Sequence, residues 1–271
     1  MDQPTLVARA ARLRALHTPG DPLVLPNAWD AASGRAVVAA GFPVVATSSS
    51  AVGASLGWGD GEKTPPDEMF AAVWRIARSL DEVAPAAAAA AAAQAAGGPG
   101  VPLTADLEGG YGLPPDDFVR RMLEAGAVGC NLEDSDHSGA AVLRDPAEHA
   151  SYLAAVRAAA RAAGVDIVLN ARVDVFLRQV GEPTERAGLA VERGKRYLAA
   201  GADCIFPFGV REEADITAMI EALDGPLNVI LVPGAPPLAR LRELGVARVS
   251  FGGRLQRATI EELKLQLQSI A

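Results

Sequence analysis

The sequence is poor in aromatic residues and in cysteine, and both shortages narrow the possible architectures. Phe, Trp and Tyr make up 5% of the 271 residues, while 50% of the residues are hydrophobic. The core must therefore be built from small Ala, Val and Leu side chains, which suits helices packed over a buried sheet. The two cysteines, Cys130 and Cys204, lie in separate apolar segments and match no metal-binding or redox spacing, so we interpret both as buried, reduced thiols.

Runs of Lys or Arg are also missing, and the formal net charge is -8 at pH 7. This charge repels phosphate backbones and anionic lipid, so neither nucleic acid nor a membrane surface is an expected partner. An anionic substrate would need local attraction from a bound cation or from one buried arginine.

No segment has the pattern of a signal peptide or a membrane span. Residues 1–17 lack a positive start followed by an apolar run, which favours a cytoplasmic location. The alanine-rich run at residues 86–96 is too short to cross a bilayer. We interpret it as a helix or a compositional expansion.

Eight short apolar segments alternate with segments of helical spacing and predict eight strands. They lie at residues 23–29, 44–50, 103–108, 129–134, 166–174, 202–208, 227–233 and 248–253. Such alternation requires parallel strands, and eight of them close into a (β/α)8 TIM barrel, whose usual length is about 250 residues. We expect residues 1–271 to form a single barrel domain. An open doubly wound sheet is the alternative, but no glycine fingerprint follows the first strand.

Glycines that precede several of these strands predict where helices end. Gly41, Gly126 and Gly201 each follow a helical segment directly before a strand, where a left-handed residue ends a helix. Short connections at this end of the barrel leave the longer loops for the other end.

Polar side chains gather at the carboxyl ends of three neighbouring predicted strands, where barrel enzymes place their catalytic groups. Because successive side chains of a strand alternate, Asp106 shares a face with Glu108, and Asn131 with Glu133. Three buried acids would need a counter-charge. Oxygen ligands without a His or Cys cluster favour Mg²⁺ or Mn²⁺ over zinc. The alternative is that the acids form ordinary ion pairs with Arg172 and surface Lys or Arg.

These motifs resemble the phosphoenolpyruvate mutase/isocitrate lyase superfamily over nearly the whole chain. The resemblance is carried by LPNAWDAASGRAVVAAGF from Leu25, TSSSAVGASLGWGD from Thr47, TADLEGGYG from Thr104, GCNLEDS from Gly129 and LNARVDVF from Leu169. It implies that Asp106 binds Mg²⁺ most directly, and that Glu108, Glu133 and Asp60 complete the metal shell, partly through water. Glu108 departs from the family, which usually has Asp there.

The resemblance also implies a substrate site above the metal. Ser48 and Ser49, with neighbouring backbone N–H groups, would hold the carboxylate of a small anionic oxo-acid, and Arg172 would supply a cationic fork. Asn131 and Trp29 are further expected contacts, although a tryptophan at this place is equally compatible with the core. Arg172 and Glu133 are the expected catalytic groups.

The loop after the fourth strand departs from both branches of the superfamily. The Lys-(Lys/Arg)-Cys-Gly-His motif of the lyases is absent, as is the Asn and Lys pair of the mutases, and Phe208 stands where lyases have Glu. His137 is the titratable group in this loop and could act as a general acid or base. A solvated histidine is the plainer interpretation. His17 and His149 fall on predicted helices and are expected at the surface.

Three functional hypotheses follow. The first is a Mg²⁺-dependent lyase or hydrolase that breaks a C–C bond beside an α-oxo or α-hydroxy acid through a pyruvate-like enolate. The second is chemistry at the P–C or P–O bond of phosphonopyruvate or phosphoenolpyruvate. The third is a barrel that binds an oxo-acid without converting it. The resemblance further implies a homo-oligomer, a dimer or tetramer, in which the last helix, residues 260–270, is exchanged between subunits.

Overall fold

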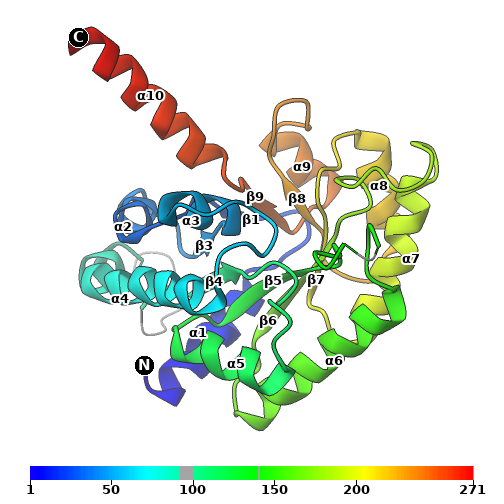
Figure 1. Ribbon diagram of the computed structural model, residues 1–271, viewed down its shortest axis with the longest axis horizontal. Helices are drawn as coiled ribbons and strands as arrows, with labels where there is room; N and C mark the ends of the chain where they lie inside the picture. The colour runs from blue at the N-terminus through cyan, green and yellow to red at the C-terminus, as the bar shows by residue number, and fades with distance from the viewer. Residues whose placement is uncertain (92–99, 140, 271) are drawn as a thin grey trace.

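Strands and helices alternate along the chain as expected, with the helices arranged around the strands (Figure 1). The computed structural model describes residues 1–91, 100–139 and 141–270. The strands are β1 (Leu23–Leu25), β2 (Asn27–Ala28), β3 (Val45–Thr47), β4 (Leu103–Asp106), β5 (Gly129–Glu133), β6 (Val168–Val173), β7 (Cys204–Pro207), β8 (Asn228–Ile230) and β9 (Arg248–Ser250).

The strands form a closed parallel ring. Pairing runs from β2 through β3, β4, β5 and β6 to β7, and from β8 through β9 to β1. A parallel bridge between Ile205 and Leu227 joins the two series on one side. On the other side β1 and β2 are two parts of the first predicted strand, separated by Pro26, which has no N–H to donate to a neighbouring strand. The predicted (β/α)8 barrel is confirmed.

The helices begin and end where local sequence signals place them. They are α1 (Gln3–Ala15), α2 (Ala31–Ala39), α3 (Ser49–Leu56), α4 (Pro66–Ala91), α5 (Pro115–Glu124), α6 (Pro146–Ala162), α7 (Arg186–Ala199), α8 (Glu213–Ala222), α9 (Leu238–Leu244) and α10 (Arg254–Ile270). Asp145 caps α6 by accepting from the N–H groups of Ala147 and Glu148 at 2.8 and 3.1 Å. Gly41, Gly126 and Gly201 follow helix ends with φ of 88°, 85° and 99°, as predicted.

Helix α1 packs against the amino ends of the strands. Leu13 is fully buried and lies so close to Gly129, the first residue of β5, that a Cβ atom there would stand 2.7 Å from its Cδ2. Arg14 donates to the carbonyl groups of Asp166 and Ile167 at 2.9 and 2.7 Å. The polar groups at the opposite, carboxyl ends of the strands are therefore the ones available for chemistry.

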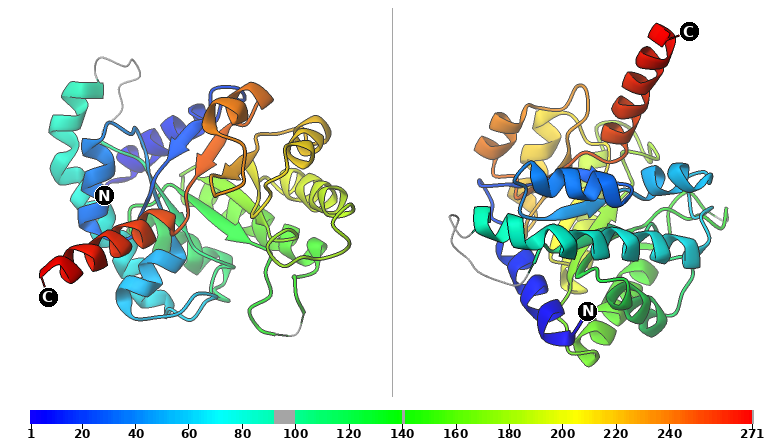
Figure 2. Two further views of the ribbon diagram at one scale, coloured as in Figure 1. Left: turned by 90° about the horizontal axis from the view of Figure 1, so that it is seen from above. Right: turned by 90° about the vertical axis from the view of Figure 1, so that its left-hand side faces the viewer.

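Helix α10 projects away from the barrel (Figure 1 and the right-hand view of Figure 2). None of its residues is buried, and its apolar side chains are exposed by 45 to 81% at Ile260, Leu263, Leu265, Leu267 and Ile270. The predicted terminal helix is confirmed, and its exchange between subunits stays a prediction.

The alanine-rich run begins as a continuation of α4, which extends to Ala91. The rest of the run, from residue 92, lies outside the described residues. Within the part of the chain that is described, no helix has both the length and the apolar character needed to cross a membrane.

Candidate active site

Four charged side chains lie buried at the carboxyl ends of β4, β5 and β6. Asp106 and Glu133 end their strands, Glu108 follows β4 by two residues, and Arg172 belongs to β6. Their exposures are 9% for Asp106, 2% for Glu108, 3% for Glu133 and 8% for Arg172. These three acids and one base are thus removed from water within one region. Their hydrogen-bond and ion-pair partners therefore determine whether each can stay charged.

Asp106 is held by neutral hydrogen-bond donors. Its Oδ2 accepts from the backbone N–H and the hydroxyl of Ser49 at 3.1 and 2.8 Å, and its Oδ1 accepts from the side-chain amide of Asn131 at 3.2 Å. Ser49 is the first residue of α3, and Ser48 is the N-cap of this helix. The helix therefore begins directly beside the carboxylate, and Ser48 and Ser49 lie at its N-terminal end rather than in a strand.

Glu108 has an unusual backbone and an unusual pKa. Its φ is 49°, in the left-handed region that non-glycine residues seldom adopt. Its carboxylate accepts from the backbone N–H of Glu62 and, at 3.2 Å, from the Tyr111 hydroxyl. The pKa of Glu108 is raised to about 7, chiefly by burial and also by the negative charges of Glu133, Asp106 and Asp60, against the lowering effect of the Glu62 N–H. Asp60 is exposed.

Glu133 joins two expected functional residues. Its Oε2 lies 2.5 Å from Nη1 of Arg172, and its Oε1 lies 2.6 Å from Nε2 of His137. Burial raises the pKa of Glu133, although Arg172 opposes this rise. The hydrogen bond to Glu133 raises the pKa of His137, whose side chain is only 9% exposed. His137 is thus buried against an acid, and not the solvated loop histidine of the plainer interpretation.

Arg172 already has a bidentate partner that the sequence interpretation did not assign. Its Nε and Nη2 donate to the two oxygens of Asp174 at 2.7 and 3.0 Å, and the Phe208 ring centre lies 4.0 Å from its guanidinium carbon. Asp174 is fully buried. The sequence did contain a signal for this pair, because two residues that are two positions apart on a strand, such as Arg172 and Asp174, have their side chains on the same face. Trp29 is half-buried and packs against the core.

The ion-pair alternative accounts for only some of these acids. Arg172 pairs with Glu133 and Asp174. Asp106 and Glu108 form no ion pair with Lys or Arg anywhere in residues 1–91, 100–139 and 141–270. Among those same residues, no three His, Cys, Asp or Glu side chains already converge as a metal shell. The donors are nevertheless carboxylate oxygens, and burial together with the neighbouring negative charges raises the pKa of Glu108; this chemistry fits a hard cation.

Comparison with known proteins identifies the family. The family model described as phosphoenolpyruvate phosphomutase matches residues 13–271. This chain belongs to that family. The superfamily inferred from the motifs is confirmed, and with it the expectation of an enzyme of the phosphoenolpyruvate mutase/isocitrate lyase type.

Relatives of this phosphoenolpyruvate phosphomutase family member include proteins of different activity. A crystal structure from Burkholderia cenocepacia J2315, described as a candidate phosphonomutase, is 39% identical, with a TM-score of 0.84 over 96% of this chain and 99% of that chain. An uncharacterised protein of Mycobacterium tuberculosis H37Rv is 34% identical over 88% of this chain and 80% of its own length. The 2,3-dimethylmalate lyase of Eubacterium barkeri is 28% identical over 87% and 75%.

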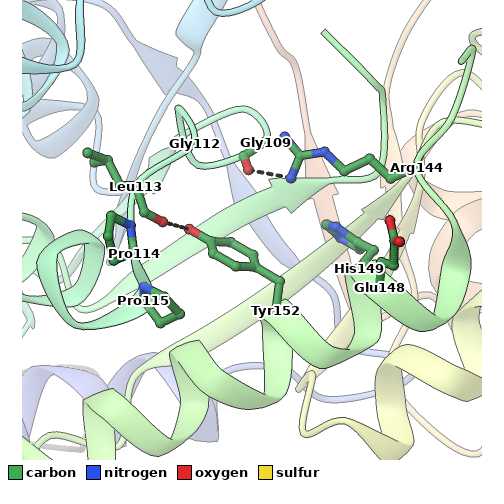
Figure 3. A pocket seen from close by; sticks show the side chains of 9 residues that line it. All are labelled: Gly109, Gly112, Leu113, Pro114, Pro115, Arg144, Glu148, His149 and Tyr152. Carbon is green, nitrogen blue, oxygen red and sulfur yellow. Dashed lines mark hydrogen bonds between the residues drawn. The ribbon is translucent and has the colours of Figure 1, made fainter. Parts of the chain in front are cut away.

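A hollow of about 440 Å³ lies between the loop that follows β4 and the start of α6 (Figure 3). Across it the Tyr152 hydroxyl donates to the Leu113 carbonyl at 3.2 Å, and Arg144 donates to the Gly109 carbonyl at 2.9 Å. None of the four charged residues of the candidate site lines this hollow, so the two are separate features of the family member.

Of the two histidines expected at the surface, His149 is buried and His17 is half-buried. His149 lines the hollow but is only 1% exposed, and its ring packs edge-on against Tyr197 with 5.0 Å between ring centres. Burial lowers its pKa to about 3. His17 lies beyond the end of α1 and is half-buried. Helical spacing did not indicate which face of α6 is turned toward the barrel. The expectation that His149 lies at the surface was therefore wrong.

Proposed function

We propose that this protein is a divalent-metal-dependent lyase or hydrolase that breaks a C–C bond beside an α-oxo or α-hydroxy acid through an enolate. The observation that carries the proposal is the pair Asp106 and Glu108, two buried acids that pair with no Lys or Arg among the residues that the structure describes, beside the Glu133–Arg172 pair. Relatives named 2-methylisocitrate lyase and 2,3-dimethylmalate lyase support C–C cleavage. So does a structure, 25% identical with a TM-score of 0.79, of oxaloacetate acetylhydrolase with the product oxalate.

Asp106 would bind the metal most directly, with Glu108, Asp60 and Glu133 contributing partly through water. Oxygen donors of this kind select Mg²⁺ or Mn²⁺. The bound dication would supply Lewis-acid stabilisation of the negative charge that develops on the α-oxygen of the substrate. Because both oxygens of Glu133 already face Arg172 and His137, we assign Glu133 the outer place among these acids.

The residues of the chain would bind the small anionic acid and move a proton. Ser48, Ser49 and the N–H groups at the start of α3 are placed to hold a carboxylate. Asn131 and Trp29 would complete the contacts. Arg172, kept in one orientation by Asp174, supplies positive charge on the β6 side. His137 Nε2 and Glu133 Oε1 lie 2.6 Å apart, within hydrogen-bond distance, and would be the pair through which the proton is transferred.

The second candidate is conversion at a P–C or P–O bond. The observation in its favour is the match to the phosphomutase family model, together with the candidate phosphonomutase that is 39% identical. Both candidates use an enolate beside a carboxylate, and they differ in the bond that breaks.

Asp106→Asn is the variant that tests the proposal. Wild-type protein with Mg²⁺ is incubated with branched 2-hydroxy and 2-oxo diacids, and pyruvate and oxalate release are measured. We expect turnover that falls at least about 100-fold in Asp106→Asn, because a ligand oxygen is lost. Asp116→Asn, at an exposed acid of α5, is the matched control and should keep wild-type turnover.

Three outcomes separate the alternatives. Equal turnover in Asp106→Asn and wild type would refute the metal role of Asp106. Phosphorus NMR that shows conversion of phosphonopyruvate would favour the second candidate. If every substrate stays unchanged while calorimetry shows Mn²⁺-dependent oxalate binding, the protein is a binding barrel without catalysis.

The proposal includes a single barrel domain that assembles as a homo-oligomer. Leu263, Leu267 and Ile270 follow one another at helical spacing on α10 and are exposed by 48, 56 and 81%. A projecting apolar helix is expected to be covered by another copy of the chain.

A further inference from the structure

Arg248 is a fully buried base in the interior of the barrel. It is the first residue of β9 and is 1% exposed. No Asp or Glu pairs with it within the described part of the chain, and its Nε has no hydrogen-bond partner there. Burial of a guanidinium without a carboxylate partner raises the free energy of the folded state, because the hydration that is lost is not replaced by an ion pair.

Two neutral side chains contact the guanidinium of Arg248, one at each of its terminal nitrogens. His17 Nδ1 lies 2.8 Å from the Leu13 carbonyl, which requires the proton of a neutral ring to be on Nδ1. Its Nε2 is then an acceptor for Arg248 Nη1 at 3.4 Å. Burial and, to a smaller extent, the charge of Arg248 lower the pKa of His17 to about 4, so the ring is neutral near pH 7. On the other side Arg248 Nη2 donates to Oδ1 of Asn131 at 3.2 Å.

The contacts of Asn131 determine which way its amide points. Oδ1 of Asn131 accepts from Arg248 and, at 2.7 Å, from Nδ2 of Asn170. With two donors on its oxygen, Asn131 must turn its NH₂ group in the opposite direction, where it donates to Oδ1 of Asp106 at 3.2 Å. The reverse orientation would bring the oxygen of Asn131 against the carboxylate of Asp106.

We propose that Arg248 is a positioning residue for Asp106 and acts through the amide of Asn131. The hydrogen bonds run from Arg248 to Asn131 and from Asn131 to Asp106, while Ser49 holds the other oxygen of the same carboxylate. The buried arginine thus keeps Asp106 oriented for a divalent cation. This inference rests on the proposed function, in which Asp106 binds the metal.

Binding of Mn²⁺ alone, measured by calorimetry or electron paramagnetic resonance, distinguishes positioning from a through-space charge effect. If Arg248 acted only as a nearby positive charge, Arg248→Met would bind Mn²⁺ more tightly, because a repulsion is removed. Positioning through Asn131 predicts the opposite sign, with Mn²⁺ bound about tenfold more weakly, as is usual when the support of a ligand is removed.

A second variant tests whether the effect of Arg248 on Mn²⁺ affinity is transmitted through Asn131. In an Asn131→Ala background, Arg248→Met should cause no further loss of Mn²⁺ affinity, because the residue that transmits the effect is already gone. Arg248→Lys keeps the charge but replaces the planar fork, so it should also weaken Mn²⁺ binding, and it serves if Arg248→Met does not fold. Arg161→Met, at an arginine of α6 whose side chain is 70% exposed, is the matched control.

The outcomes are distinguishable. A wild-type protein that does not bind Mn²⁺ would overturn the metal role in the proposed function and this inference with it. If the wild type binds Mn²⁺, then equal or tighter binding by Arg248→Met and Arg248→Lys would overturn this inference alone. Losses that multiply in the double variant would also overturn it, since they would show that Arg248 does not act through Asn131.

Discussion

The raised pKa of Glu108 predicts that the metal-free protein loses stability as pH rises through a defined window. An ordinary glutamate titrates at 4.5, and burial raises the pKa of Glu108 to about 7. Below pH 4.5 the side chain is protonated in both the folded and the unfolded state and carries no penalty. Between 4.5 and 7 the unfolded state loses its proton first, so the free energy of unfolding falls, and above 7 the full penalty is present. This difference corresponds to about 3 kcal/mol.

Glu108→Gln removes the titrating group and should remove this dependence. Urea unfolding of chelator-treated protein is measured between pH 4.5 and 8 for wild type, Glu108→Gln and the control Glu221→Gln, at an exposed glutamate of α8. The difference in unfolding free energy between Glu108→Gln and wild type should change by about 3 kcal/mol in favour of the variant as pH rises through the window. Other titrating groups cancel in this difference.

A bound dication should reverse the effect. Mg²⁺ favours the ionised form of a neighbouring carboxylate, so saturating Mg²⁺ should reduce the pH dependence of the wild type and leave that of Glu108→Gln unchanged. A difference between the two proteins that stays flat from pH 4.5 to 8 would refute the reasoning, because it would show that Glu108 is not buried with other acids in solution.

Two further predictions concern the arginine of the site and the projecting helix. Asp174→Ala leaves the buried Arg172 with Glu133 as its acidic partner and should lower the free energy of unfolding by about 3 kcal/mol. The measurement is urea unfolding, with Asp224→Ala at an exposed position as the control. A loss as small as that of the control would contradict the bidentate role of Asp174. Leu263→Glu with Leu267→Glu replaces two exposed apolar side chains of α10 by charged ones and should convert the proposed oligomer into monomers, as measured by light scattering. Arg257→Glu, on the same helix, is its control, and unchanged assembly in the double variant would show that α10 is not the contact.

Much of the architecture follows from local sequence because its causes are local. The period of apolar residues, the proline starts of α5 and α6 and the glycines after α2, α5 and α7 depend on neighbouring residues, so the alternation of strands and helices could be predicted. The predicted strand bounds likewise placed Asp106 and Glu133 at the carboxyl ends of their strands, and strand alternation placed Asp106 on one face with Glu108 and Glu133 with Asn131. Boundaries were less certain: the first strand is divided at Pro26, and the second ends at Thr47 because Ser48 already caps a helix.

The partners of the charged groups were decided only by the tertiary structure. The sequence by itself determined which acids, amides and bases stand at the strand ends. It left open whether Arg172 pairs with these acids, and it did not indicate what His137 and Arg248 would contact. Closure of the barrel brings Asn131 between Asp106 and Arg248, which are 142 residues apart in numbering, and buries His137 against Glu133. Such contacts depend on distance in space and on the exclusion of water, and neither property belongs to a short segment of chain.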